Sequence, residues 1–245
     1  MSRRVPVGRS SNAKPGLDEL GAEIAACRAC PRLVSWREQV ATLKRASYRD
    51  DSYWGRGVPG FGDPAASLLV LGLAPAAHGA NRTGRVFTGD RSGDWLFRAL
   101  HRAGVANQPT SDHLGDGLQL HGAWVAAAVR CAPPGNKPLP DERTNCLPFL
   151  HREVHLLFQL RCILVLGQFA YDVARRDLGV AGTRVAKFGH GVETTMTLFD
   201  ERVVSVVCSY HPSQQNTFTG TLTEPMLDAA VGRAVQLSGN DRSAL

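Results

Sequence analysis

The sequence predicts an α/β protein in which a mostly parallel sheet lies between two layers of helices. Four short apolar runs are rich in Val, Leu and Ile with little alternation of apolar and polar residues, which is typical of strands buried on both faces. The predicted strands are Ser67–Leu73, Trp124–Val129, Cys162–Leu166 and Val203–Cys208. Helical segments separate these runs, and strands that alternate with helices indicate a three-layer arrangement.

The predicted helices lie between and outside these strands. They cover Leu17–Ala26, Ser92–Ala103, Asp141–Leu160, Gln168–Leu178 and Glu224–Leu237. We expect Pro148 to end or kink the third of them, because proline lacks a backbone N–H and its ring clashes with the preceding turn. The polar stretch Thr183–Phe199 contains glycine and β-branched residues, and it predicts a hairpin or a loose excursion.

Length and composition predict one domain with short tails. The chain has 245 residues, of which 43% are hydrophobic, and this is enough for one sizeable core. We expect a disordered basic tail over residues 1–15, a single domain over 16–237 and a flexible tail over 238–245. No apolar run approaches the roughly 20 residues that cross a bilayer. The basic start lacks the apolar segment of a secretory signal, so we expect a cytoplasmic protein without a membrane partner.

The charge balance favours a polyanionic partner. Lys and Arg outnumber Asp and Glu by 28 to 22, which gives a formal net charge of +6. Basic side chains that neutralise phosphates release counterions and so gain affinity for nucleic acid. The excess is small, however, and by itself it does not separate nucleic-acid binding from an ordinary basic surface.

Three of the predicted strands run directly into loops rich in Gly, Pro, His or Asn. These loops are Gly72–Pro75, Cys131–Asn136 and Tyr210–Ser213. In open α/β sheets the ligand crevice lies outside the carboxyl ends of the strands. We therefore expect three segments that are distant in the sequence to meet at one site.

Four of the six cysteines form a pattern that suits metal binding. Cys27 and Cys30 are a C-x2-C pair, and Cys131 and Cys146 flank the proline-rich loop. Four thiolates from separated places suit either a [4Fe–4S] cluster or structural zinc. A redox pair of Cys27 and Cys30, or simple burial, stays open as an alternative. The other two, Cys162 and Cys208, lie in predicted strands, where a thiol acts as a small hydrophobe.

The loop motifs resemble those of a known family. Gly72–Ala76, Gly79–Arg85 and Phe87–Asp90 together resemble the first motif of the family 5 uracil-DNA glycosylases, and His211–Ser213 resembles the second motif of the wider superfamily. The cysteine spacing resembles that of the cluster ligands in the family 4 and family 5 enzymes. The resemblance extends from about Cys27 to Ser213.

This resemblance implies a uracil-DNA-glycosylase-like fold with a central four-stranded, mostly parallel sheet. It implies a DNA repair glycosylase that hydrolyses the N-glycosidic bond of uracil and of other deaminated or damaged bases in double-stranded DNA. It further implies a structural [4Fe–4S] cluster on Cys27, Cys30, Cys131 and Cys146. We expect the protein to be a monomer that acts at the bacterial nucleoid.

Some positions depart from other families of the superfamily. Ala74 stands where many members carry Asp or Asn to position water, Leu73 where family 4 has Glu, and Ala127 where family 4 has Asn. All three fit family 5. A site without such polar groups rejects analogues weakly. We therefore expect a permissive pocket, in which Gly72, Ala74 and Pro75 lie against the base.

Four further residues are predicted to act on the base or the sugar. We expect Phe87 to stack on a base that has left the duplex, and His211 to donate a hydrogen bond to the developing negative charge on uracil O2. Asp90 is predicted to position water or to stabilise the oxocarbenium ion, although it could simply cap a helix. Asn136 resembles the family 5 Asn near the base or the water, although Asn beside Gly is also common in turns.

Polar residues of the same loops are the predicted DNA contacts. They are Arg82, Arg85, Arg91, Lys137, Ser213, Gln214 and Gln215. The glutamines and the following Asn216 are predicted to enter the duplex where the base has left. Two other functions stay open: an iron–sulfur DNA-binding protein without glycosylase activity, and a redox protein that uses Cys27 and Cys30.

Overall fold

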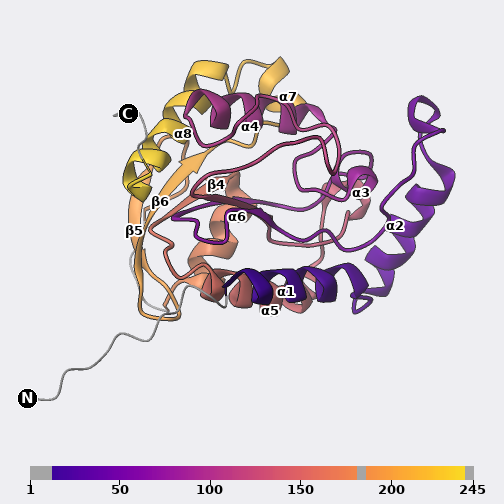
Figure 1. The fold of residues 1–245 in the computed structure, drawn as a ribbon, viewed down its shortest axis with the longest axis horizontal. Coiled ribbons are helices and arrows are strands. Elements are labelled where there is room, and N and C mark those ends of the chain that lie inside the picture. The colour runs from indigo at the N-terminus through magenta and orange to yellow at the C-terminus, as the bar shows by residue number, and fades with distance from the viewer. Residues whose placement is uncertain (1–12, 181–185, 241–245) are drawn as a thin grey trace, which may run out of the picture.

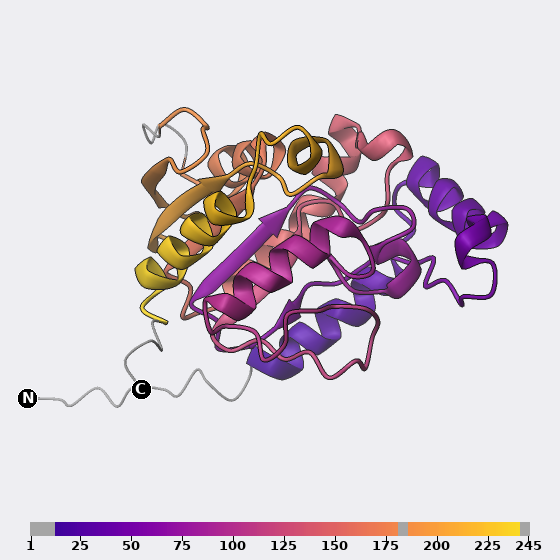
Figure 2. The ribbon, with the colours of Figure 1, turned by 90° about the horizontal axis from the view of Figure 1, so that it is seen from above.

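The computed structural model describes residues 13–180 and 186–240. Its centre is a six-stranded sheet in the order β1-β3-β2-β4-β6-β5. Helices cover both faces of this sheet, as Figures 1 and 2 show. The strands are β1 (Phe61–Gly62), β2 (Leu68–Gly72), β3 (Ala123–Ala127), β4 (Cys162–Leu166), β5 (Glu193–Thr197) and β6 (Val203–Ser209).

The four predicted strands are confirmed as the parallel centre of the sheet. Strand β2 pairs in parallel with β3 and β4, and β4 pairs in parallel with β6. The sheet has two strands more than the four that were predicted, because β1 and β5 add one antiparallel strand at each edge. Strand β1 has only two residues, and β5 is polar, so neither has the apolar pattern of the central strands. Strand β5 forms the hairpin with β6 that was one expectation for Thr183–Phe199.

Alternate residues of the central strands supply two separate cores. In β2, Leu68 and Val70 belong to the core under α4 (Arg91–Arg102) and α8 (Glu224–Ser238). Leu69 and Leu71 belong to the core under α1 (Ala13–Ala26), α5 (Pro140–Leu156) and α6 (Gln168–Val173). This period-2 alternation places both layers on the same strands. Figure 1 shows α4 and α8 on one face and α1 and α5 on the other.

The helices differ in detail from the predicted ones. Helix α5 runs through Pro148 and stops at Leu156, so of the two effects expected of this proline, an end of the helix does not occur. Proline removes one hydrogen bond there, while Cys146 and Leu150 on either side are buried and hold the helix against its neighbours. Residues 168–178 form α6 followed by a π-helical turn, η4 (Ala174–Leu178).

Five helical elements were not predicted from the sequence, and three of them follow the carboxyl ends of β2, β3 and β6. They are α2 (Pro31–Leu43), η2 (Ala46–Tyr48), α3 (Ala80–Thr83), η3 (Pro134–Asn136) and α7 (Gln214–Phe218). Helix α2 projects from the body of the protein in Figure 1.

The ends of the predicted domain are only partly described. Helix α1 begins at Ala13, inside the predicted N-terminal tail, and α8 ends at Ser238. The rest of both tails, residues 1–12 and 241–245, lies outside the described residues. Within the described part, no helix is both long enough and apolar enough to span a bilayer.

Candidate active site

The three predicted loops meet at one pocket of about 620 Å³. The pocket lies where β2 and β6 end, as expected for a parallel sheet. Its lining includes residues from five separated parts of the chain: Arg45 and Tyr48; Leu73, Ala74 and Ala76–Gly79; Val86, Phe87 and Gly89–Ser92; Asn136; and His211 and Ser213–Gln215. A pocket of this size takes a nucleobase with part of its sugar.

Phe87 is held in the pocket wall by an uncommon backbone conformation. Its φ is +54°, in the left-handed region that non-glycine residues rarely adopt. Its ring lies over Gly72, where a Cβ would come within 2.6 Å of the ring. The ring centroid is 5.8 Å from that of His211. Phe87 is only 8% exposed, and it lines the pocket.

His211 follows β6 directly and is fixed through its backbone. The side-chain amide of Asn216 donates to the His211 carbonyl at 2.8 Å. Burial lowers the pKa of the imidazole to about 4, so the ring is neutral at neutral pH and keeps one N–H donor. Within the described residues the ring nitrogens have no recorded hydrogen-bond partner, and the ring faces the pocket.

Asp90 both caps a helix and lines the pocket. It is the N-cap of α4, and its Oδ1 accepts from the Gly93 backbone N–H at 3.0 Å. Its Oδ2 lies against Gly79, where a Cβ would come within 2.1 Å. Burial raises the pKa of this carboxyl above its ordinary value. The capping role that the sequence left open is therefore present, and it fixes the carboxyl group at the pocket wall.

Asn136 lines the pocket from the tight turn η3. Its φ is +57°, so the turn conformation that the sequence left open is present together with the pocket position. Of the three residues expected against the base, Ala74 lines the pocket, whereas Gly72 and Pro75 are not in its lining. Gly72 contributes indirectly, because its lack of a side chain leaves room for the Phe87 ring.

Arg85 does not have the position expected of a DNA contact. Its guanidinium makes a two-pronged ion pair with Asp116, and both side chains are only 6% exposed. Burial opposes ionisation of Asp116, but hydrogen bonds from Arg85 and from the Leu118 and Asp112 backbone outweigh this and hold its pKa well below the usual range. Arg85 therefore joins two loops of the protein and offers no donor to a phosphate.

Arg82 is likewise engaged within the protein. Its guanidinium pairs with Asp51 at 2.7 Å, donates to the Gly89 carbonyl at 3.0 Å and stacks on the Tyr48 ring at 4.1 Å. These contacts tie the segment that follows α2 to the first-motif loop. They bring Tyr48 to the pocket, and with it Arg45.

The other predicted DNA contacts lie at the rim. Arg91 lines the pocket and stacks on Phe218 at 4.5 Å, and Lys137 is exposed beside Asn136. Ser213 caps α7 by accepting from the Asn216 backbone at 3.3 Å. The two glutamines, Gln214 and Gln215, open α7 and line the pocket.

Among the pocket residues that were not predicted from the sequence are Arg45, Tyr48 and His78. His78 accepts or donates at 3.0 Å to the Tyr53 hydroxyl. The run Lys44–Arg49 combines basic and aromatic residues, which is a pattern of nucleic-acid contacts. Its connection to the pocket depends on Arg82, and that long-range contact has no signal in the local sequence.

The four predicted metal ligands line one small enclosed space. Cys27, Cys30, Cys131 and Cys146 approach each other there as free thiols. N–H donors point at three of the sulfurs: the Arg37 guanidinium at Cys131 (2.9 Å), the Asn145 amide at Cys30 (3.5 Å) and the Arg130 backbone at Cys146 (3.5 Å). Across residues 13–180 and 186–240, no group of three or more His, Cys, Asp or Glu is arranged around a single metal ion.

The fold and the pocket define a three-layer α/β protein whose ligand site is built by loops at the carboxyl ends of parallel strands. Residues 59–233 match the family model of the uracil DNA glycosylase superfamily. The chain is 55% identical over 222 residues to a type-5 uracil-DNA glycosylase of Mycobacterium tuberculosis, covering 90% of this chain and 81% of that protein. It is 50% identical over 230 residues to the type-5 enzyme of Mycobacterium leprae, covering 94% and 99%.

A relative of lower identity is also a type-5 enzyme. The type-5 uracil-DNA glycosylase of Thermus thermophilus is 45% identical over 216 residues, which cover 88% of this chain and 95% of that protein. This chain belongs to the uracil DNA glycosylase superfamily and to the type-5 group within it.

Proposed function

We propose that this protein is a DNA repair glycosylase that hydrolyses the N-glycosidic bond of uracil in DNA. The observation that carries the proposal is the single pocket in which Phe87, Asp90 and His211 come together from separate loops. It is supported by membership in the type-5 group, which also leaves the non-catalytic and redox alternatives without an observation in their favour.

The first step is extrusion of the base into the pocket. A glycosylase has to take its target out of the stack before it can reach the glycosidic bond. The Phe87 ring offers an apolar face beside Ala74, and the His211 ring lies next to it. Stacking on Phe87 would orient the base so that its O2 faces the imidazole.

His211 is the proposed donor to the leaving base. As the bond breaks, the base becomes an anion and the sugar gains oxocarbenium character. A neutral imidazole with a preorganised N–H can donate a hydrogen bond to this anion, and it does not need to be protonated before the reaction. The lowered pKa of His211 supports this role, because it keeps the ring neutral at neutral pH.

Asp90 and Asn136 are the proposed water-side residues. The Asp90 carboxylate is fixed by its cap contact with Gly93, and its second oxygen can accept a proton from water or face the sugar cation. Asn136 lines the same pocket, and its amide can both donate and accept. Since Ala74 offers no polar group, Asp90 is the carboxylate that we assign to this step.

We propose that the four cysteines hold a [4Fe–4S] cluster rather than zinc. Four cysteines from three separated segments line one small space, and four thiolates are the ligand set of a [4Fe–4S] cluster. The N–H donors aimed at three sulfurs suit an anionic cluster. Burial raises the pKa of the Cys146 thiol to about 12, so metal binding has to displace that proton. The cluster would join the α1–α2 turn to the loop after β3 and to α5.

The proposed DNA-contacting rim consists of Arg45, Arg91, Lys137, Gln214 and Gln215, which line or adjoin the pocket. The glutamines stand at the start of α7, where they can fill the space that the base leaves in the duplex. Because Ala74 cannot select a base by hydrogen bonding, we also propose activity on other deaminated or damaged bases. A monomeric state and a place at the nucleoid stay predictions.

An excision assay tests the proposed function. The full-length protein, carrying its metal, is incubated with a duplex that contains one uracil, and abasic sites are cleaved with alkali. We expect a single cleaved product at the uracil position, and none with the matched thymine duplex. Absence of cleavage with protein that is folded and binds the duplex would favour the non-catalytic alternative. The same assay over a panel of damaged bases measures the breadth of the substrate range.

A further inference from the structure

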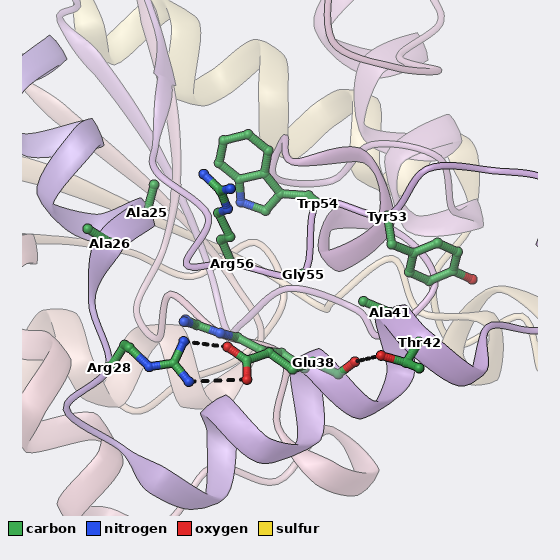
Figure 3. A pocket seen from close by; sticks show the side chains of 11 residues that line it. Ala25, Ala26, Arg28, Glu38, Ala41, Thr42, Tyr53, Trp54, Gly55 and Arg56 are labelled. Carbon is green, nitrogen blue, oxygen red and sulfur yellow. Dashed lines mark hydrogen bonds and ion pairs between the residues drawn. The ribbon is translucent and has the colours of Figure 1, made fainter.

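A second cavity, of about 420 Å³, lies between the end of α1, helix α2 and the loop that contains Tyr53–Arg56. It is separate from the pocket described above. We call it the arginine pocket, because Arg28, Arg37 and Arg56 line it (Figure 3). Small side chains, Ala25, Ala26 and Ala41, keep it open.

The charge of the arginine pocket favours an anion. Its lining contains three guanidinium groups against one carboxylate, that of Glu38. Arg28 neutralises this carboxylate through a two-pronged contact, which Figure 3 shows as dashed lines. Across residues 13–180 and 186–240, no ion pair is recorded for Arg56, which stacks at 5.7 Å from the Trp54 ring centroid.

Arg37 supplies a fixed, buried guanidinium to the lining of the arginine pocket. The residue is 1% exposed, and its Nε is shielded from solvent. Arg37 therefore adds a positive charge to the pocket, while its donors stay inside the protein. The other end of the same guanidinium donates to Cys131 and to the Cys27 carbonyl, which fixes its position.

The arginine pocket adjoins the active-site pocket. Tyr53 lines the first, and its hydroxyl is hydrogen-bonded to His78, which lines the second. The backbone of Trp54 and Gly55 is bonded to the carbonyls of Arg82 and Asn81 in α3, so the loop moves with the first-motif segment. The loop that carries Arg56 is therefore attached to a segment next to the active-site pocket.

We propose that the arginine pocket binds a phosphate group of the DNA backbone, with Arg56 as its main contact and the fixed charge of Arg37 behind it. The inference rests on the proposed function. The shared chemistry is a phosphate, which a free mononucleotide could also supply. DNA is the favoured source because a hydrogen bond joins the linings of the two pockets and the chain carries an excess of basic residues.

The test compares Arg56→Gln with Arg176→Gln, an exposed arginine on η4 outside both pockets. Affinity of the holoprotein for an undamaged duplex is measured between low and moderate salt. One lost phosphate contact lowers the salt slope by about 1 and weakens binding about fivefold at 0.15 M salt. We expect this for Arg56→Gln and not for Arg176→Gln. Unchanged affinity and slope in Arg56→Gln, with the fold shown intact by thermal unfolding, would overturn the proposal.

Trp54 fluorescence separates the two sources of phosphate, because its ring lies beneath Arg56. Trp54→Phe identifies the part of the signal that belongs to this residue. We expect the undamaged duplex to change that signal at concentrations far below those of inorganic phosphate or deoxyuridine monophosphate. A saturable change with the mononucleotide at equal or lower concentration would overturn the DNA assignment. Uracil excision by the wild-type protein is scored separately, so failure of the catalytic proposal is recognised independently.

Discussion

The α-carbon of Gly79 lies directly against the carboxylate of Asp90, and a Cβ at position 79 would come within 2.1 Å of Asp90 Oδ2. The two residues belong to one motif but to different elements, since Gly79 precedes α3 and Asp90 caps α4. The contact leaves the carboxylate one position at the pocket wall. The requirement for glycine at 79 is therefore a requirement of the site.

Gly79→Ala should displace the Asp90 carboxylate and slow excision. We expect the single-turnover rate to fall about 10-fold or more, but by no more than in Asp90→Ala, because only the placement of the carboxylate is changed. Loss of the cap contact should cost about 1 kcal/mol of unfolding free energy. Gly232→Ala in α8 is the control, since nothing lies within 4 Å of its added Cβ. An unchanged rate in Gly79→Ala would show that Asp90 does not act at this position.

Arg85→Ala should lower stability rather than DNA affinity. It leaves the Asp116 carboxylate buried without its partner, and breaking such a pair costs about 3–5 kcal/mol. Arg102→Ala is the control, because Arg102 pairs with Asp228 at the surface and should cost less than about 1 kcal/mol. Denaturant unfolding measures both. A large loss of DNA affinity in a stable Arg85→Ala protein would restore Arg85 as a phosphate contact.

The contrast between Arg85 and His211 shows which parts of the site could be predicted from the sequence. His211 lies just after a buried strand, so the carboxyl-edge rule for parallel sheets placed it at the site, whereas Asp90 was assigned through the first-motif resemblance. Arg82 and Arg85 stand in the same loop, but their contacts with Asp51 and Asp116 join segments about thirty residues apart. A local pattern cannot tell whether a basic side chain in such a loop faces solvent or a buried carboxylate.

The same reasoning applies to the sheet. Three of the four central strands are buried throughout, and β6 is buried over most of its length, which made their apolar runs visible. Strand β5 is half exposed and polar, and β1 has only two residues, which pair with β3. Edge strands of this kind depend on neighbours that are distant in the sequence, so composition alone did not reveal them.

The cysteine site predicts loss of iron on substitution. Cys146→Ser removes one of the four ligands, and we expect the purified protein to lose most of its iron and its broad visible absorbance. Cys208→Ala is the control, because Cys208 is buried in β6 away from the four ligands and should leave the iron content unchanged. Full iron in Cys146→Ser, or zinc in place of iron in the wild type, would contradict the cluster.

The pH dependence of excision should report Asp90 and not His211. The pKa of His211 is lowered to about 4, so the neutral ring predominates above about pH 5 and its donor is unaffected from pH 6 to 8. The pKa of Asp90 is raised, so its carboxylate is lost as the pH falls through a value above the ordinary one. We expect the rate to decline on the acidic side, with a midpoint above the ordinary pKa of an aspartate, and we expect Asp90→Asn to reduce this decline. If the rate instead fell as the pH rose through about 6.5, a protonated His211 would be required for excision.

His211→Ala should damage the chemical step most. The leaving anion develops in a pocket with little water, where one preorganised donor contributes about 3–4 kcal/mol. Since Ala74 cannot activate water, more of the barrier reduction has to come from stabilising the base. We expect the single-turnover rate of His211→Ala to fall about a hundredfold or more, and Asp90→Ala to cost less.

The control for this comparison is His113→Ala, an exposed histidine outside the pocket lining. DNA affinity should change little in all three variants, because neither pocket residue is a proposed phosphate contact. Single-turnover kinetics with enzyme in excess separate chemistry from product release. If Asp90→Ala is crippled while His211→Ala stays near the wild-type rate, the water-side carboxylate carries the barrier reduction and the imidazole serves only to shape the pocket.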